Sequence, residues 1–117
     1  MVEVVATDEF ASWYRSLDDR DGDAVDVIVD LLADQGVRLG HPYSSAILGA
    51  SVALRELRTK SDGSVIRIFY AFDPVRAAVL IIGGDKRGDD RFYERMVPLA
   101  EKIWKRYLEE QKQEQKP

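Results

Sequence analysis

The sequence contains no cysteine and only one histidine, and these absences exclude two classes of site. Neither a disulfide framework nor a thiolate metal site can form without thiols, and one imidazole cannot anchor a zinc cluster alone. The longest apolar runs, such as residues 77–82, are far shorter than the roughly 20 residues that span a bilayer. The acidic N-terminus also lacks the basic and then apolar layout of a signal peptide. We therefore expect a cytoplasmic protein with no membrane partner and no metal or other cofactor.

The charge of the chain is unevenly distributed. Its net value of −4 argues at first sight against nucleic acid, because binding to a polyanion depends on Lys and Arg that neutralise phosphates. However, residues 1–36 carry two basic and ten acidic side chains, whereas residues 37–91 carry nine basic and six acidic ones. Salt screens charges beyond about 8 Å, so the local balance is the relevant one. The middle of the chain can therefore present a positive face.

Two segments near the N-terminus have the apolar spacing of amphipathic helices. Residues 8–17 follow a capping threonine, and the second segment begins near Val25 and ends at Gly36. Residues 18–23 are expected to connect them. The aspartates of the second segment lie on its polar side, and we interpret them as a solvated face, because calcium loops need ligands on a tight turn.

Strand patterns dominate the middle of the chain. A short β-branched segment opens the chain, residues 38–51 are loop-like, and three strands are predicted at 53–59, 65–72 and 77–82, with turn residues between them. Tight turns imply antiparallel pairing. A last helical region follows Asp89 or Asp90, and Pro98 either starts a new segment or kinks it.

The length of 117 residues and the hydrophobic content of 45% fit one compact domain. We predict an α+β fold of order βααβββα, in which two N-terminal helices and a C-terminal helix pack on one face of a mainly antiparallel sheet. The domain is expected to span residues 1–108. Residues 109–117 form a polar tail that is expected to fray.

Alternation along the strands separates the charged residues into rows. Glu56 and Arg58 share one face, and Arg55 lies on the other row. On the next strand the row that begins at Ile66 is apolar and predicts the helix-covered face, which places Arg67 on the open face. These charges can serve a site, or they can be cross-strand ion pairs that contribute up to about 1 kcal/mol each. The spacing leaves both interpretations open.

Glycines at positions 83, 84 and 88 surround Lys86 and Arg87. The segment lacks the P-loop spacing and the Ser or Thr after the lysine, so we do not interpret it as a nucleotide cradle. The glycines instead predict that the strand ends in a bend that aims the two cations across the sheet. His41, in a polar loop before a proline, is either a general base or an ordinary surface or packing residue.

In their order and spacing these segments resemble a toxin of the RelE/ParE superfamily, from type II toxin–antitoxin systems, closest to its HigB-like, phage-derived branch. The resemblance covers most of the chain and is carried by five stretches: Val2–Leu17, Leu39-Gly40-His41-Pro42-Tyr43, Leu54-Arg55-Glu56-Leu57-Arg58, Arg67-Ile68-Phe69-Tyr70-Ala71-Phe72 and Gly84-Asp85-Lys86-Arg87. It implies a small RelE-like fold with a curved sheet. Many such toxins cleave messenger RNA in the ribosome, and a cognate helix-turn-helix antitoxin blocks them.

The resemblance also implies roles for individual residues. Arg67 and Arg87 match arginines that bind phosphate and stabilise the transition state, and Tyr93 falls where some members have a catalytic tyrosine. Glu56 is either a base or the salt-bridge partner of Arg58 or Arg67. Further contacts to RNA are expected from Arg58, Lys86 and Arg55. The implied chemistry is attack of the RNA 2′-OH on the neighbouring phosphorus without a metal.

The chain departs from the ribosome-dependent members of this superfamily at Leu54 and Glu56, where those members place lysines. The expected function is a metal-independent endoribonuclease that acts on mRNA at the ribosome. The first alternative is a non-enzymatic inhibitor of DNA gyrase, as in the ParE branch. The second is a degenerate toxin that acts as a co-repressor with its antitoxin and meets DNA only through that complex.

Overall fold

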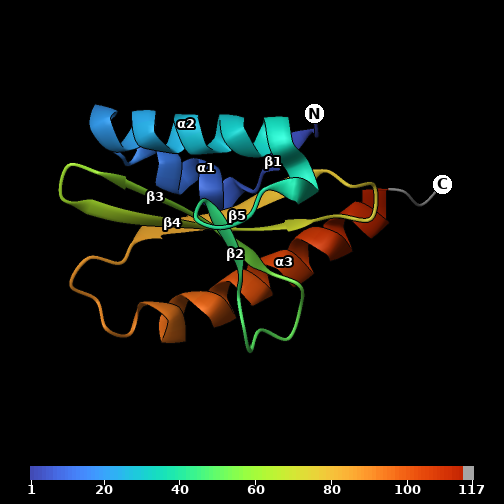
Figure 1. The fold of residues 1–117 in the computed structure, drawn as a ribbon. Coiled ribbons are helices and arrows are strands. Elements are labelled where there is room, and N and C mark those ends of the chain that lie inside the picture. The colour runs from blue at the N-terminus through green and yellow to red at the C-terminus, as the bar shows by residue number, and fades with distance from the viewer. Residues whose placement is uncertain (115–117) are drawn as a thin grey trace.

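A computed structural model describes residues 1–114 of the chain. The elements follow in the order β1 (Val4–Ala6), α1 (Asp8–Arg15), α2 (Asp19–Gln35), the 3-10 helix η1 (Gly36–Arg38), β2 (Ser44–Ala46), β3 (Arg55–Ser61), β4 (Ser64–Phe72), β5 (Ala78–Asp85) and α3 (Phe92–Glu114). The three α-helices pack on a single sheet (Figure 1). This arrangement confirms the predicted α+β class.

The five strands form one sheet in the order β1-β5-β4-β3-β2. All neighbouring pairs are antiparallel except β1 and β5, which run parallel, so the sheet is mainly antiparallel as predicted. The strand β2 lies in a segment that the sequence predicted to be a loop. It is only three residues long, which is too short to show an alternating pattern.

Helices cover both faces of the sheet, so the prediction of a single covered face is wrong. The helices α1 and α2 lie on one side of the sheet and α3 lies on the other (Figure 1). Ile68 of β4 is buried in the cluster under α1 and α2, whereas Phe69 is buried in the cluster under α3. A strand buried on both faces has two apolar rows, and the row of Phe69 is covered as well as the row of Ile68.

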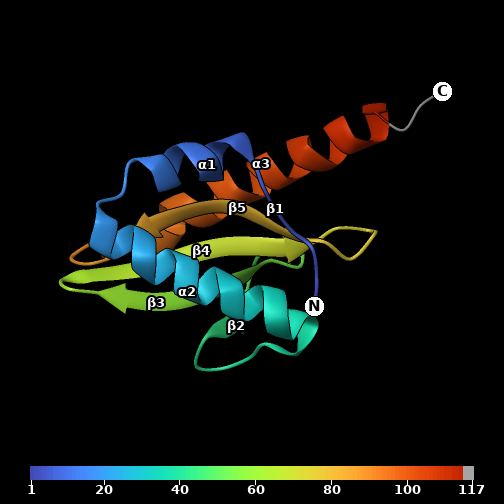
Figure 2. The same cartoon turned by 90° about the horizontal axis from the view of Figure 1, so that it is seen from above.

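The two N-terminal helices meet with almost no connecting loop. The Asp18 side chain accepts a hydrogen bond of 2.8 Å from the Asp21 N–H and caps α2, so most of the predicted connection at residues 18–23 is helical instead. Gly36 has a φ of +57° and ends α2, as predicted. Seen from above, α2 lies over β3 and β4 and α1 lies beside β5 (Figure 2).

The C-terminal helix α3 is longer than the sequence predicted. It passes through Pro98 without ending, so no new segment starts there. It also continues to Glu114 through residues that were expected to fray. Residues 115–117 of the predicted tail lie outside the described residues. Its N-terminal part packs on the sheet through Phe92 and Met96, and this contact positions the candidate site.

The two glycines of β5 serve close packing rather than the predicted bend, since the strand continues to Asp85. A Cβ atom at Gly83 would lie 2.4 Å from the ring of Trp13 in α1. On the opposite face, a Cβ atom at Gly84 would lie 2.8 Å from the ring of Phe92 in α3. The missing side chains therefore allow helices to approach β5 from both sides.

We expect Gly83→Ala to lower the free energy of unfolding by about 2 kcal/mol, because the added methyl group overlaps a rigid indole ring. Urea unfolding followed by circular dichroism measures the change. The matched control is Gly22→Ala in α2, where no atom lies within 4 Å of the added Cβ. That variant should be more stable than the wild type by about 0.5 kcal/mol. Equal stability of Gly83→Ala and the wild type would contradict the packing argument.

Candidate functional site

Three side chains from three elements meet at the centre of the candidate site. Arg67 of β4 and Glu56 of β3 are both buried, with exposed fractions of 4% and 6%. Their Nε and Oε1 atoms lie 3.5 Å apart. The Tyr93 hydroxyl, from the first turn of α3, donates a hydrogen bond of 2.6 Å to the same Oε1 atom. The Glu56 carboxylate therefore links an arginine and a phenol.

Strand register and aromatic packing explain this arrangement. Glu56 lies opposite Phe69 in the antiparallel pair of β3 and β4, and Arg67 is two residues earlier on the same face of β4. Phe92 stacks on Phe69 with ring centroids 6.0 Å apart, and Tyr93 meets the same ring edge-on at 6.2 Å. The start of α3 is thus fixed on Phe69, and its tyrosine reaches the carboxylate.

The sequence predicted that Arg67 lies on an open face, and this prediction is wrong. Arg67 is buried because α3 covers that side of β4. Its Nη1 atom donates a hydrogen bond of 2.9 Å to the carbonyl of Ile66. The buried Nε–H has no hydrogen-bond acceptor within residues 1–114, since the Glu56 oxygen at 3.5 Å is outside bonding geometry. A buried cation with an unused donor is costly, and such a group is a natural partner for an anion.

A second arginine lies directly opposite the first. Arg58 of β3 pairs in register with Arg67 of β4, a placement that puts two like charges side by side and is unfavourable on its own. Arg67 has a carboxylate within 4 Å, but Arg58 has none in the described part of the chain. Lys60 lies two residues further on the same face of β3. We refer to Arg58, Lys60 and Arg67 as the cationic cluster.

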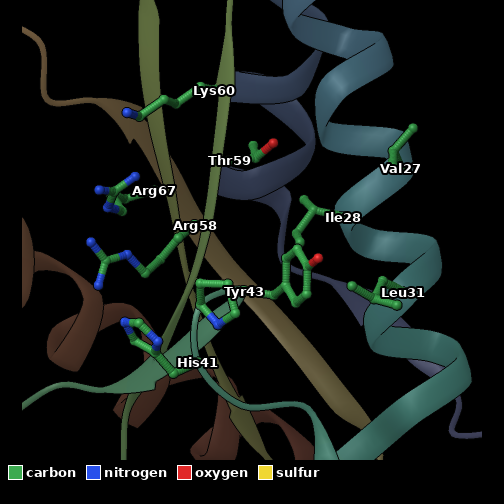
Figure 3. Close-up of a pocket in the computed structure, with 10 residues that line it drawn as sticks. Val27, Ile28, Leu31, His41, Tyr43, Arg58, Thr59, Lys60 and Arg67 are labelled. Atoms are coloured by element: carbon green, nitrogen blue, oxygen red, sulfur yellow. The ribbon is translucent and has the colours of Figure 1, made fainter.

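Figure 3 shows the cationic cluster on one side of β3, with His41 on the same side. Two other predicted cations are not brought to it. Arg87 lies 3.8 Å from Asp85 and against the turn between β3 and β4, where a Cβ atom at Gly63 would be 2.6 Å from its Nη1. Arg55 is on the opposite row, where its Nε donates to the Ser44 hydroxyl at 3.1 Å.

Lys86 lies over the ring of Tyr93. Its Nζ atom lies 5.6 Å from the ring centroid, a cation–π distance. Burial raises the pKa of Tyr93 above the ordinary value of 10.0, and the Glu56 hydrogen bond and charge raise it further, while Arg67 opposes them. The phenol is therefore protonated at neutral pH. The effect of Arg67 does not outweigh burial and Glu56, so the pKa stays raised and Tyr93 fits a proton donor better than a base.

Two further contributors were not identified from the sequence. The Ser45 hydroxyl of β2 donates to Glu56 Oε2 at 3.3 Å, so both carboxylate oxygens are held. This contact depends on β2, for which the sequence carries no signal. Lys60, in contrast, shares the parity of Glu56 and Arg58, and the alternation of β3 would have been enough to place it.

No group of three or more metal-ligating side chains occurs within residues 1–114. No helix of that part of the chain is long and apolar enough to cross a membrane. With the residues present, the site offers cations, a held carboxylate and a protonated phenol. These groups together suit proton transfer next to a developing negative charge.

Comparison with known proteins places the chain among phage-related and toxin-like sequences. Residues 12–105 match the family described as "Phage derived protein Gp49-like". A protein of Mycobacterium tuberculosis (strain ATCC 25618 / H37Rv), "Putative toxin HigB3", is 33% identical over 107 residues, which cover 90% of this chain and 92% of that protein. "Putative toxin HigB2" of the same strain is 29% identical over 104 residues, or 86% of this chain and 52% of that longer protein. No solved structure gives a significant match.

Proposed function

The chain belongs to the Gp49-like family of phage-derived proteins and is HigB-like, and on that premise we propose that it is a toxin that cleaves messenger RNA. The family and its relatives support a toxin of a type II toxin–antitoxin system, with an antitoxin as its partner. The proposal adds the reaction, namely metal-independent cleavage of mRNA during translation at the ribosome.

The observation that carries this proposal is the pairing of Arg58 with Arg67 across β3 and β4. The two arginines lie side by side. Within residues 1–114 one carboxylate lies within 4 Å of Arg67 and none lies within 4 Å of Arg58, so the pair carries an excess of positive charge. A phosphodiester supplies the missing negative charge, and its charge increases in the transition state. A gyrase inhibitor has no comparable need for a buried arginine beside a carboxylate and a phenol.

The geometry of Glu56 and Tyr93 supports a division of proton transfer between them. In the proposed reaction Glu56 takes the proton of the RNA 2′-OH, whose oxygen attacks the adjacent phosphorus. The bond from phosphorus to the 5′ oxygen breaks, and Tyr93 protonates that oxygen. The products are a 2′,3′-cyclic phosphate and a 5′-hydroxyl end. Because Tyr93 lies 2.6 Å from Glu56, a proton that returns along this hydrogen bond restores both groups.

The proposal is tested by inducing the protein in a bacterial host and mapping new RNA 5′ ends across the transcriptome. Cuts inside translated frames, lost when translation is blocked, are the expected result. Growth arrest and DNA damage that depend on gyrase, with no new RNA ends, would replace the nuclease with a gyrase inhibitor. Absence of both growth arrest and RNA cleavage would favour a co-repressor.

We expect Tyr93→Phe to reduce the rate of RNA cleavage by about 100-fold, because the variant keeps the aromatic packing and loses only the proton donor. Single-turnover cleavage of mRNA in a translating extract measures this rate. The control is Tyr107→Phe, a tyrosine further along α3 that stacks on Trp104. If the two variants cleave at the same rate, Tyr93 has only a packing role.

The Tyr93→Phe variant also tests the pKa of Tyr93. Its pKa is raised from 10.0 in the folded protein, so the phenol should resist ionisation as the pH passes 10. Ultraviolet titration of the wild type minus Tyr93→Phe should show a tyrosine that ionises above pH 10. Because the unfolded chain ionises first, the contribution of Tyr93 to stability is complete below pH 10 and decreases above it. A difference curve centred below 10 would contradict the raised pKa of Tyr93.

A further inference from the structure

A groove of about 540 Å³ runs between α2 and the outer edge of β3, next to the cationic cluster. Its α2 side is lined by Val27, Ile28 and Leu31, and Tyr43 also lines it. Figure 3 shows these side chains on one side of β3 and the cationic cluster on the other. One surface therefore joins an apolar wall to a row of positive charges.

Two apolar residues of the groove are largely exposed. Val27 is 70% exposed and Tyr43 is 50% exposed, and both line the same groove. Isolated exposed apolar residues are common, but apolar residues gathered in one groove that is rimmed by charge are typical of binding surfaces. The side chains of the groove thus predict a ligand with an apolar part.

The edge of β3 at this groove is unpaired. The strand β2 pairs with β3 only as far as Leu57, and the N–H of Arg58 still donates to the carbonyl of Tyr43 at 2.9 Å. Beyond it, residues 59–61 of β3 have a strand neighbour on the β4 side but none on the outer side in the described chain. An open edge of this kind can accept the backbone of an added strand.

Side chains of a strand placed along this edge would alternate between the two sides. Thr59 of β3 faces the apolar wall, whereas Arg58 and Lys60 face the other way (Figure 3). Alternate residues of an added strand would therefore meet Val27 and Leu31 on one side and the cations on the other. The complementary sequence alternates apolar and acidic residues.

We propose that this groove binds an extended segment of the antitoxin, in which apolar side chains contact α2 and carboxylates contact Arg58 and Lys60. This inference rests on the proposed function, because it identifies the partner as the antitoxin and its target as the edge of the site. RNA fits the apolar wall less well, since Asp23, Asp26 and Asp30 surround Val27 on the same helix. A carboxylate beside Arg58 would also occupy the place proposed for a phosphate, so docking would inhibit cleavage.

The probe is a synthetic peptide of about nine residues, enough for one strand, with alternating valine and glutamate. Its binding to the full chain is measured by fluorescence polarisation, and its position by NMR shifts of backbone amides. We expect the largest shifts at residues 59–61 and Val27. Lys60→Glu should weaken binding about tenfold and should improve binding of a second peptide with lysine in place of glutamate.

Val27→Asp should also weaken binding of the glutamate peptide about tenfold, whereas the control Val75→Asp should not change it. Val75 is exposed to a similar degree, at 76%, but lies in the loop between β4 and β5. Shifts elsewhere, equal binding to Lys60→Glu, or no binding at about 1 mM peptide would overturn the proposal. Displacement of the peptide by single-stranded RNA, with RNA-induced shifts at Val27, would assign the groove to RNA instead. The direct peptide titration contains no RNA, so loss of nuclease activity and loss of docking are separate results.

Discussion

Arg67→Ala should abolish RNA cleavage and growth arrest, with a fall in cleavage rate of at least about 1,000-fold. The side chain supplies a buried positive charge and an N–H that no acceptor within residues 1–114 uses. Removal of one donor that stabilises developing charge costs about 100- to 1,000-fold in many enzymes. Arg67 would also carry part of the binding to phosphate. Growth curves after induction and single-turnover cleavage of mRNA measure the two effects.

Loss of folding could imitate this result, because Arg67→Ala leaves the buried Glu56 without its counter-charge. Removal of one partner from a buried ion pair costs about 3–5 kcal/mol. Arg67→Lys keeps the charge, so it should remain folded, and it should still lose at least about 100-fold in cleavage because the planar fork of donors is gone. Arg15→Ala, on an exposed part of α1, is the control that should keep full toxicity. Toxicity of Arg67→Lys equal to that of the wild type would mean that only charge is needed at this position.

The rows of the central strands were predictable, because alternation along a strand is a local property. It correctly placed Glu56, Arg58 and Arg67 on one face and Arg55 on the other. Alternation could not predict that a helix covers that face. The helix α3 packs on Phe69 through Phe92, and this contact between distant parts of the chain buries Arg67. The face that was predicted to be open is therefore covered, and Arg67 and Glu56 form a buried pair at the edge of a groove.

The position of Arg87 shows a second limit of the sequence. Its place directly after β5 suggested that it joins Arg67, and Lys86 beside it does reach Tyr93. Neighbouring residues at the end of a strand point to different sides, however, and Arg87 turns toward Gly63 and Asp85. The direction of a side chain beyond the last strand residue depends on the turn that follows, which the sequence did not specify.

The uneven charge of the chain acquires a structural meaning in the fold. The acidic side chains of residues 8–34 lie on the layer of α1 and α2, and the cationic cluster lies on the side of the sheet that faces α3. The sheet separates the two kinds of surface. An RNA strand is then attracted to one side and repelled from the other, so a net charge of −4 does not conflict with a site for phosphate.

Glu56→Gln is the second substitution with a large expected effect. The amide has the shape of the carboxylate and can still accept the Tyr93 hydrogen bond, but it cannot take a proton from the RNA 2′-OH. We expect the rate of cleavage in single turnovers to fall by about 1,000-fold. The apparent affinity for RNA should stay the same or increase, because a negative charge 3.5 Å from Arg67 has been removed. A fall in rate without a fall in affinity would identify a group that acts in the chemical step.

A structural role for Glu56 predicts a different set of results. If Glu56 only balances Arg67, the variant should lose stability, with cleavage reduced only as far as the folded fraction is reduced. Ultraviolet titration provides an independent readout, because the Glu56 hydrogen bond and charge raise the pKa of Tyr93 and their loss should lower it. The control is Glu101→Gln, which should leave cleavage unchanged. Glu101 also lies on α3, and its carboxylate accepts a hydrogen bond of 2.7 Å from the Ser51 N–H. A lowered Tyr93 pKa together with full cleavage would show that the pair is formed but that Glu56 is not the base.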